Sequence, residues 1–123
     1  MKKIIYAAIF IGMMFSVAVN AGQALTQKEI KALTIGKTVD AVHLTKGFNF
    51  QVYFDDKGNA IQFKNGEENP GHYKFDGDKH CVDFSGSMKC MNIEKNDDGT
   101  YTRVKANGKR IINWTKFTDG KQF

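Results

Sequence analysis

The stretch FNFQVYF, residues 48–54, places large apolar side chains at every second position. Phe48, Phe50, Val52 and Phe54 alternate with Asn49, Gln51 and Tyr53. Successive side chains of a strand point to opposite faces of the sheet, so this alternation predicts a β-strand with one apolar face. We therefore expect a β protein whose core lies on the side of these phenylalanines.

Turn sequences recur along the chain after this strand. They are Asp55-Asp56-Lys57-Gly58, Asn65-Gly66, Asp76-Gly77, Ser85-Gly86, Asp97-Asp98-Gly99, Asn107-Gly108 and Asp119-Gly120. Their regular spacing favours short antiparallel strands that follow one another in a meander. The other strands that we expect are 39–44, 60–64, 72–75, 80–84, 88–95, 101–106 and 110–117, with Pro70 in a loop.

A short helix is predicted ahead of the first strand. Thr26 and Glu29 have the spacing of a capping box, in which each side chain bonds the backbone amide of the other residue. The helix should run from Gln27 to Leu33 or Thr34, and Gly36 is placed to end it. The predicted fold class is mainly β, with this helix followed by an antiparallel meander of about seven or eight strands. The meander forms either a bent sheet or a small barrel.

The beginning of the chain has the layout of a secretory signal peptide. Lys2 and Lys3 precede an uncharged apolar run from Ile4 to Val19, and small residues follow up to Ala21. The run has 16 residues, and a membrane-spanning helix needs about 20. We expect cleavage after Ala21, with Ala24 as the alternative site. The mature protein would then work in a periplasm or outside the cell.

Removal of residues 1–21 leaves residues 22–123, enough for a single β-rich domain with one core. The loss of Lys2 and Lys3 lowers the formal charge from +5 to +3, and the remaining lysines are scattered among acidic residues. A nucleic-acid partner is therefore not expected. Stable membrane insertion after cleavage is not expected either.

Both cysteines lie in CVDFSGSMKC, residues 81–90. If Ser85-Gly86 is a two-residue hairpin loop, Cys81 stands directly opposite Cys90 at a separation that a disulfide can bridge. Exported proteins usually pair their cysteines. We therefore predict a disulfide, worth about 2 to 3 kcal/mol because the loop it closes is short.

Other side chains that could carry chemistry have simpler explanations. His43, His72 and His80 are expected at the surface or in hairpins, and no metal or cofactor is expected. Aspartates 76, 78, 83, 97 and 98 adjoin turn glycines, which favours a role in the turns. Nucleophile and phosphate-loop motifs are absent from the sequence. An enzyme is not expected, although a small hydrolase that uses the turn carboxylates is the alternative from a different class.

The chain has many aromatic residues, and most of them are expected in the core. A surplus of rings leaves room for an apolar cavity or a docking patch. Phe50, Tyr53, Tyr73 and Trp114 are our candidates for contact with a ligand or partner. We expect a non-enzymatic binding module for a small apolar ligand or a protein partner. A second copy of the chain, in a homodimer, is one such partner. An inhibitor of a cell-wall hydrolase is the second hypothesis.

Three segments resemble a family of small exported proteins of Gram-negative bacteria that is classed as a domain of unknown function. They are LTQKEIKALTIGKTV at 25–39, GHYKFDGDKHCVDF at 71–84 and DDGTYTRVKANGK at 97–109. The shared positions include Leu33, Gly36, Gly71, Cys81 and Cys90, and Tyr73 stands where tryptophan is common. The resemblance extends over nearly all of 25–117. It implies an exported protein with a disulfide, and it implies no catalytic residues.

Overall fold

The computed structural model describes residues 22–123, which form one helix and eight strands. The predicted signal peptide, residues 1–21, lies outside the described residues. In chain order the elements are α2 (Gln27–Thr34), β2 (Lys37–His43), β3 (Asn49–Phe54), β4 (Asn59–Lys64), β5 (Glu67–Asp76), β6 (Lys79–Asp83), β7 (Lys89–Lys95), β8 (Tyr101–Val104) and β9 (Arg110–Asp119). The prediction of a mainly β protein with a short helix before the strands is confirmed.

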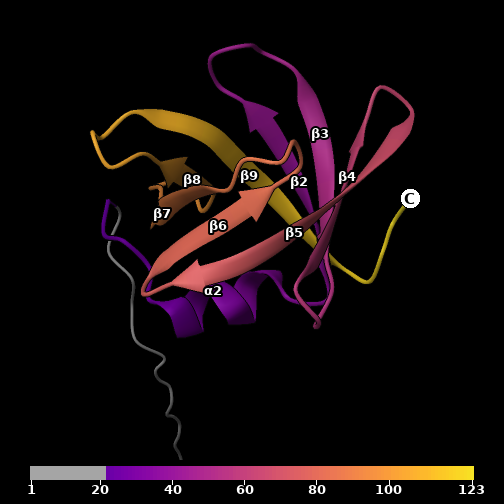
Figure 1. Ribbon diagram of the computed structural model, residues 1–123. Helices are drawn as coiled ribbons and strands as arrows, with labels where there is room; N and C mark the ends of the chain where they lie inside the picture. The colour runs from indigo at the N-terminus through magenta and orange to yellow at the C-terminus, as the bar shows by residue number, and fades with distance from the viewer. Residues whose placement is uncertain (1–21) are drawn as a thin grey trace, which may run out of the picture.

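The eight strands close into an antiparallel barrel (Figure 1). Each strand pairs with the next along the chain, and β9 returns to pair with β2, as in the pair Thr38 and Thr118. The register shifts between Asp40 and Ala41 in this last ladder, where an irregularity increases the local bend. Of the two predicted forms of the meander, the closed barrel is therefore the one that the chain adopts.

The helix α2 lies across one end of the barrel (Figure 1). The predicted capping box is present, since the Thr26 hydroxyl accepts from the Glu29 amide and the Glu29 carboxylate accepts from the Thr26 amide. Gln27 ties the helix to the turn between β5 and β6, because its side chain donates to the carbonyl of Gly77 and its amide donates to Asp78. Ile30 is fully buried beneath the helix. The helix therefore closes this end of the barrel.

We call the end covered by α2 the capped end; it carries the turns 55–58, 77–78 and 96–100. The opposite end, which we call the open end, carries the loops 44–48, 65–66, 84–88 and 105–109. Consecutive connections of an up-and-down barrel lie at opposite ends, so turns that alternate in the sequence share an end.

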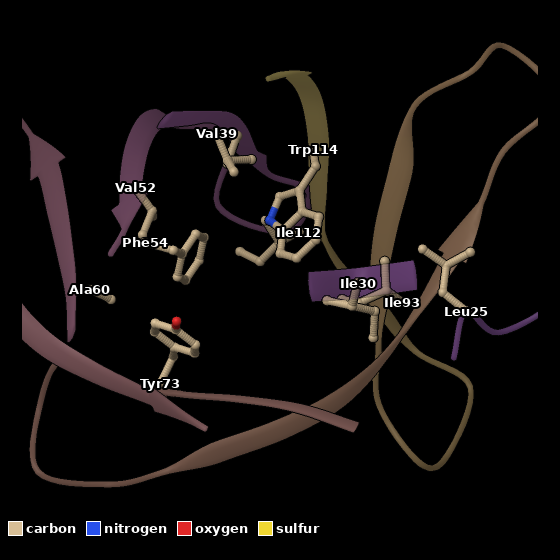
Figure 2. Packing of buried hydrophobic residues seen from close by; sticks show 11 residues of the cluster. Leu25, Ile30, Val39, Val52, Phe54, Ala60, Tyr73, Ile93, Ile112 and Trp114 are labelled. Atoms are coloured by element: carbon tan, nitrogen blue, oxygen red, sulfur yellow. The ribbon is translucent and has the colours of Figure 1, made fainter. Parts of the chain in front are cut away.

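The core lies inside the barrel and extends to the helix α2 (Figure 2). Phe54 and Trp114 are almost fully buried, and Phe54 meets Tyr73 edge to face with ring centroids 5.5 Å apart. Ile93 lies beside Ile30, so that the core continues up to the helix (Figure 2). Full burial of side chains of this size stabilises a fold by about 1.5 to 3 kcal/mol each. The packed core therefore continues without a break to the helix that covers the capped end.

Pro70 lies inside β5, and the prediction that it falls in a loop is wrong. The strand runs from Glu67 to Asp76, and Pro70 pairs with Ile61 of β4. On its other side β5 pairs with β6 only from His72 onward. The missing N–H of proline is tolerated where a strand has a free edge, which explains its position.

The hairpin between β6 and β7 also differs from the expected two-residue loop. The predicted register is confirmed, with Cys81 opposite Cys90, but β6 ends at Asp83 and the loop spans residues 84–88. The Asp83 carboxylate accepts from the amides of Ser85 and Gly86. These amides are therefore satisfied by a side chain, and the ladder ends early.

Candidate functional site: a cavity at the open end of the barrel

The barrel interior contains a cavity of about 640 Å³. Its volume lies within the range of about 300 to 1,000 Å³ that is typical of small-molecule sites. Inward-facing side chains of the strands line it. Residues of the open-end loops, such as Phe84, Ser85, Ser87 and Ala106, also line it. Since α2 closes the other end, the cavity is a pocket with its entrance between the open-end loops.

The walls of the cavity are mainly apolar. Phe50 and Val52 of β3 face inward beside Val82 of β6, and Ile112 and Trp114 of β9 complete the wall. Gln62 adds an uncharged polar group. Trp114 also belongs to the packed core, with only 2% of its surface exposed, so it forms the boundary between core and cavity. The arrangement of apolar walls with a few polar groups suits a small molecule with an apolar body.

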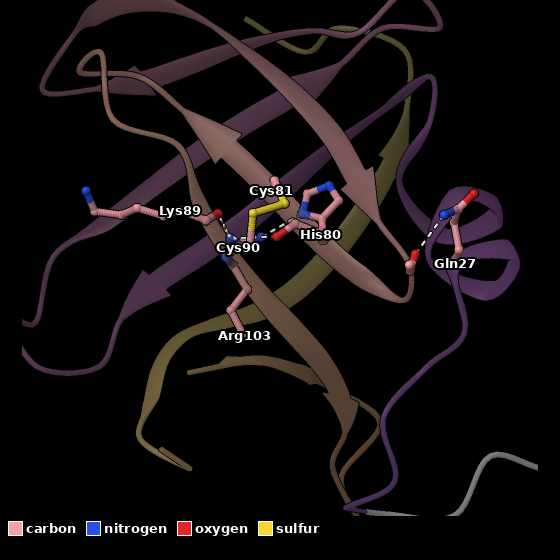
Figure 3. The surroundings of a disulfide bond; sticks show 7 residues. Gln27, His80, Cys81, Lys89, Cys90 and Arg103 are labelled. Carbon is pink, nitrogen blue, oxygen red and sulfur yellow. Dashed lines mark hydrogen bonds between the residues drawn. A yellow bond between two sulfur atoms is a disulfide. The ribbon is translucent and has the colours of Figure 1, made fainter. Parts of the chain in front are cut away.

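Arg103 of β8 reaches into this region from the barrel wall and is nearly fully buried. Its Nη1 lies 2.6 Å from Nδ1 of His80, and its Nη2 donates to the carbonyls of His80 and Lys89 at 3.2 Å each (Figure 3). The guanidinium carbon lies 6.0 Å from the ring centroid of Trp114. These contacts hold the guanidinium in one place, and within residues 22–123 none of the ion pairs includes it.

Burial lowers the pKa of Arg103 to about 10, and the side chain keeps its positive charge at neutral pH. His80, in contrast, is uncharged at neutral pH. Burial, followed by the positive charge of Arg103, holds the pKa of His80 well below its ordinary range, so its ring is neutral. Because arginine can only donate, Nδ1 of His80 accepts and Nε2 carries the proton.

The Nε2 atom of His80 is buried and has no hydrogen-bond partner among the described residues. The ring is surrounded by aromatic side chains, with the Phe54 centroid at 5.1 Å and the Trp114 centroid at 5.5 Å. Both rings meet the imidazole close to perpendicular, an arrangement in which aromatic faces accept weakly from an N–H. His80 therefore acts as a neutral bridge between the core and Arg103.

The titratable groups that line the cavity are all basic. They are His43, Lys89, Arg103 and Lys105, and the described lining contains neither Asp nor Glu. His43 lies at the entrance, where desolvation and then the charges of Lys46, Lys64 and Lys109 lower its pKa. The lysines around the entrance thus create a positive potential at the open end.

The four aromatic candidates occupy different places. Phe50 and Trp114 line the cavity. Tyr73 points into the barrel but is buried in the core, where its hydroxyl donates to the carbonyl of Asp55. Tyr53 alternates with the inward-facing Val52 and Phe54 and lies on the outside of the barrel. The structure therefore brings two of the four to the same site.

The sequence reasoning missed Arg103, and it was wrong about His80. His80 was expected at the surface or in a hairpin, yet it is fully buried in the barrel interior. His72 is exposed on β5, and His43 lies at the cavity entrance. Arg103 follows Tyr101 at a spacing of two in a predicted strand, so the alternation of faces was the signal that could have placed it inside.

The turn aspartates stabilise their own turns. Asp98 accepts from the amide and hydroxyl of Thr100, and these bonds lower its pKa. Asp55 accepts from the amides of Lys57 and Asn59. None of the aspartates that we considered for catalysis lines the cavity in the described part of the chain.

The predicted disulfide between Cys81 and Cys90 is present, with the alpha carbons 3.9 Å apart (Figure 3). Cys81 is fully buried. Such a bond forms and persists in an oxidising compartment, which agrees with an exported protein. Among residues 22–123, no helix is long and apolar enough to cross a membrane.

Comparison of the chain with protein-family models, with curated proteins and with solved structures found no match. The resemblance to a family of small exported proteins therefore stays a prediction, and the geometry of the cavity carries the functional argument.

Proposed function

We propose that this protein is a non-enzymatic binding module of the periplasm or the extracellular space that holds a small apolar ligand inside its barrel. The observation that carries the proposal is the cavity of about 640 Å³ with mainly apolar walls. A ligand there would be enclosed by Phe50, Val82 and Ile112 on several sides. Burial of its apolar surface would supply about 0.8 kcal/mol per CH₂ group.

The open end offers a route by which an apolar ligand could enter. Leu44 and Met88 are the large apolar side chains with substantial exposure in the described part of the chain, at 47% and 37%. They lie on or at the edge of the open-end loops 44–48 and 84–88. Their position supports entry of the ligand between these loops.

The contacts of the first described residues support export with cleavage after Ala21. Gly22 donates to the carbonyl of Lys95 and Leu25 donates to the carbonyl of Ile93, so this segment pairs with β7. Cleavage after Ala24 would remove the first of these bonds. Cleavage after Ala21 would keep both, and the disulfide agrees with an oxidising compartment.

Native mass spectrometry of the protein purified without reducing agent tests the proposal directly. We expect additional mass on the native species that denaturation releases. Titration with the neutral dye N-phenylnaphthylamine gives a second readout, because its fluorescence rises in an apolar pocket. Val82→Phe, which fills part of the cavity, should weaken binding of the dye.

The matched control is Val42→Phe, because Val42 is not among the cavity-lining residues. This variant should bind the dye as the unmodified protein does. A native species without additional mass, together with dye binding that is absent or equal in both variants, would refute a ligand in the barrel.

A further inference from the structure

We infer that the ligand of this cavity is a single-chain amphiphile with an anionic head group, and that the head group binds Arg103 while the apolar chain lies along Phe50, Val82 and Ile112. This inference rests on the proposed function and specifies its ligand class. The structural observation behind it is a buried cation at the boundary of an apolar cavity whose described lining holds no acidic residue.

Arg103 lacks a counter-charge within the described chain. A buried charge is costly unless an opposite charge or several hydrogen bonds compensate it. Within the described chain, Arg103 has one imidazole nitrogen and two carbonyl oxygens as partners, all of them neutral. The protein thus supplies dipoles for the guanidinium and leaves the matching negative charge to another molecule.

Two N–H groups of the guanidinium remain free, the second one on Nη1 and the one on Nε. A guanidinium has five N–H groups, and Nη1 and Nη2 make the three bonds described above. The Nε atom makes no hydrogen bond with the described residues. Among the described residues, Nε2 of His80 is the only side-chain polar atom that is both fully buried and unpaired. Nε of Arg103 is unpaired and is therefore not fully buried. Nε therefore reaches accessible space, and the cavity that Arg103 lines is the space beside it.

Basic side chains surround the path from the open end to Arg103. Lys89 and Lys105 line the same cavity, and Lys46, Lys64 and Lys109 act on His43 at the entrance. A run of like charges along a cleft concentrates ligands of the opposite sign. An anionic head group would therefore be attracted along the whole path, and a cationic head group would be repelled along it.

The shape of the site decides how the amphiphile lies. Arg103 stands beside Trp114 at the inner boundary of the cavity, whereas Ser85, Ser87 and Ala106 belong to the loops at the entrance. A head group on Arg103 therefore lies deep, and its chain runs outward along the apolar wall. Leu44 and Met88, which are exposed at the open end, can cover a chain that reaches the entrance.

Isothermal titration calorimetry with three molecules that share a decyl chain tests the head group. The probes are decanoate, which is anionic, decanol, which is neutral, and decyltrimethylammonium, which is cationic. A charge-assisted hydrogen bond should make decanoate bind about tenfold or more tightly than decanol. Decyltrimethylammonium should bind more weakly than decanol.

Variants then test the position of the head group. Arg103→Gln should weaken decanoate binding by about tenfold or more while decanol binding changes by less than about threefold. Lys89→Gln combined with Lys105→Gln should have a smaller effect on decanoate, because exposed charges contribute less. Urea denaturation shows whether each variant is folded, and the comparison of the three probes on the unmodified protein needs no variant.

Two results would overturn the inference, and they differ from failure of the proposed function. If decanol binds the unmodified protein as tightly as decanoate, the cavity binds apolar ligands without a preference for anions. If the preference for decanoate survives in Arg103→Gln but disappears in the double lysine variant, the head group lies at the entrance. If neither decanol nor N-phenylnaphthylamine binds at all, the proposed function fails and the inference fails with it.

Discussion

The two ends of the barrel differ in packing, in charge and in exposure. At the capped end, α2 covers a dense core that includes Ile30 and Ile93, both fully buried. At the open end, the loops surround a cavity of about 640 Å³ and expose Leu44 and Met88. One end is therefore closed by a helix over packed side chains, and the other is open to solvent.

The charges follow the same division. The turns 55–58, 77–78 and 96–100 at the capped end each carry aspartate, whereas the loops 44–48, 65–66, 84–88 and 105–109 at the open end carry none. All four of these loops contain or adjoin lysines. Such a separation produces a field that directs anions to the open end. It shows how a chain with scattered charges in its sequence can still present a one-sided charge in space.

The largest expected effect is on the free energy of unfolding, and two isoleucines, one at each end of the barrel, serve to compare the ends. Ile30→Ala removes a fully buried side chain under α2 and should lower the free energy of unfolding by about 2 to 5 kcal/mol. Ile111→Ala removes a half-buried side chain that borders the cavity, and it should cost less than half as much. Urea denaturation measures both. Equal losses would show that the two ends contribute equally to stability.

The disulfide should have the next largest effect. It closes a short loop around residues 84–88, so reduction should lower the free energy of unfolding by about 2 to 3 kcal/mol. Urea denaturation with and without dithiothreitol measures the loss. A variant with Cys81→Ala and Cys90→Ala is the control and should not respond to the reductant. If reduction leaves the free energy of unfolding unchanged, the disulfide does not stabilise the folded protein.

The buried His80 should make the free energy of unfolding depend on pH. Its folded pKa lies well below the ordinary value, so at a pH below about 6.5 the unfolded chain binds a proton there that the folded chain does not. Stability contributed in this way is present above that value and falls as the pH decreases. Between pH 7 and pH 5 the loss should reach up to about 2 kcal/mol.

His80→Gln should remove this dependence, because glutamine keeps an acceptor for Arg103 without a titrating ring. His72→Gln, on the exposed side of β5, is the matched control and should keep the dependence that His80 causes. Urea denaturation at a series of pH values measures both variants. An unchanged slope in His80→Gln would assign the pH dependence to other groups.

The smallest effect concerns two lysines at opposite ends. Lys105→Gln at the open end should weaken decanoate binding by about two- to threefold, since an exposed charge contributes little. Lys57→Gln, in a turn of the capped end, should leave binding unchanged. The difference between the variants should shrink in high salt, which screens exposed charges. Calorimetry at two salt concentrations measures it, and equal effects of both variants would contradict a one-sided field.

Local patterns in the sequence predicted most of the fold. The alternation in 48–54 corresponds to β3, and the capping box of Thr26 and Glu29 fixed the start of α2. The register of Cys81 and Cys90 followed from their spacing. Closure of the barrel could not be predicted in the same way, because it depends on the pairing of β2 with β9 at the far ends of the domain.

The site was predictable only in part. Phe50 and Trp114 were expected to contact a ligand and do line the cavity, but composition cannot tell an inward-facing ring from an outward-facing one such as Tyr53. Arg103 was missed because an arginine in a strand is usually exposed, and its burial depends on His80 and the carbonyl of Lys89. The division of charge was visible in the alternation of turns with and without aspartate, once the meander is known to be up-and-down.

The ladder between β2 and β9 also sets the order in which the molecule can be completed. It joins Thr38 to Thr118, so the two strands that close the barrel are the first and the last of the eight described strands to be synthesised. Contacts between residues so distant in the sequence form late in folding, and until then both strands present unpaired edges. The newly made chain thus remains an open meander until its final strand is available. If the chain is exported as we propose, this delay would keep it unfolded while it passes through the membrane.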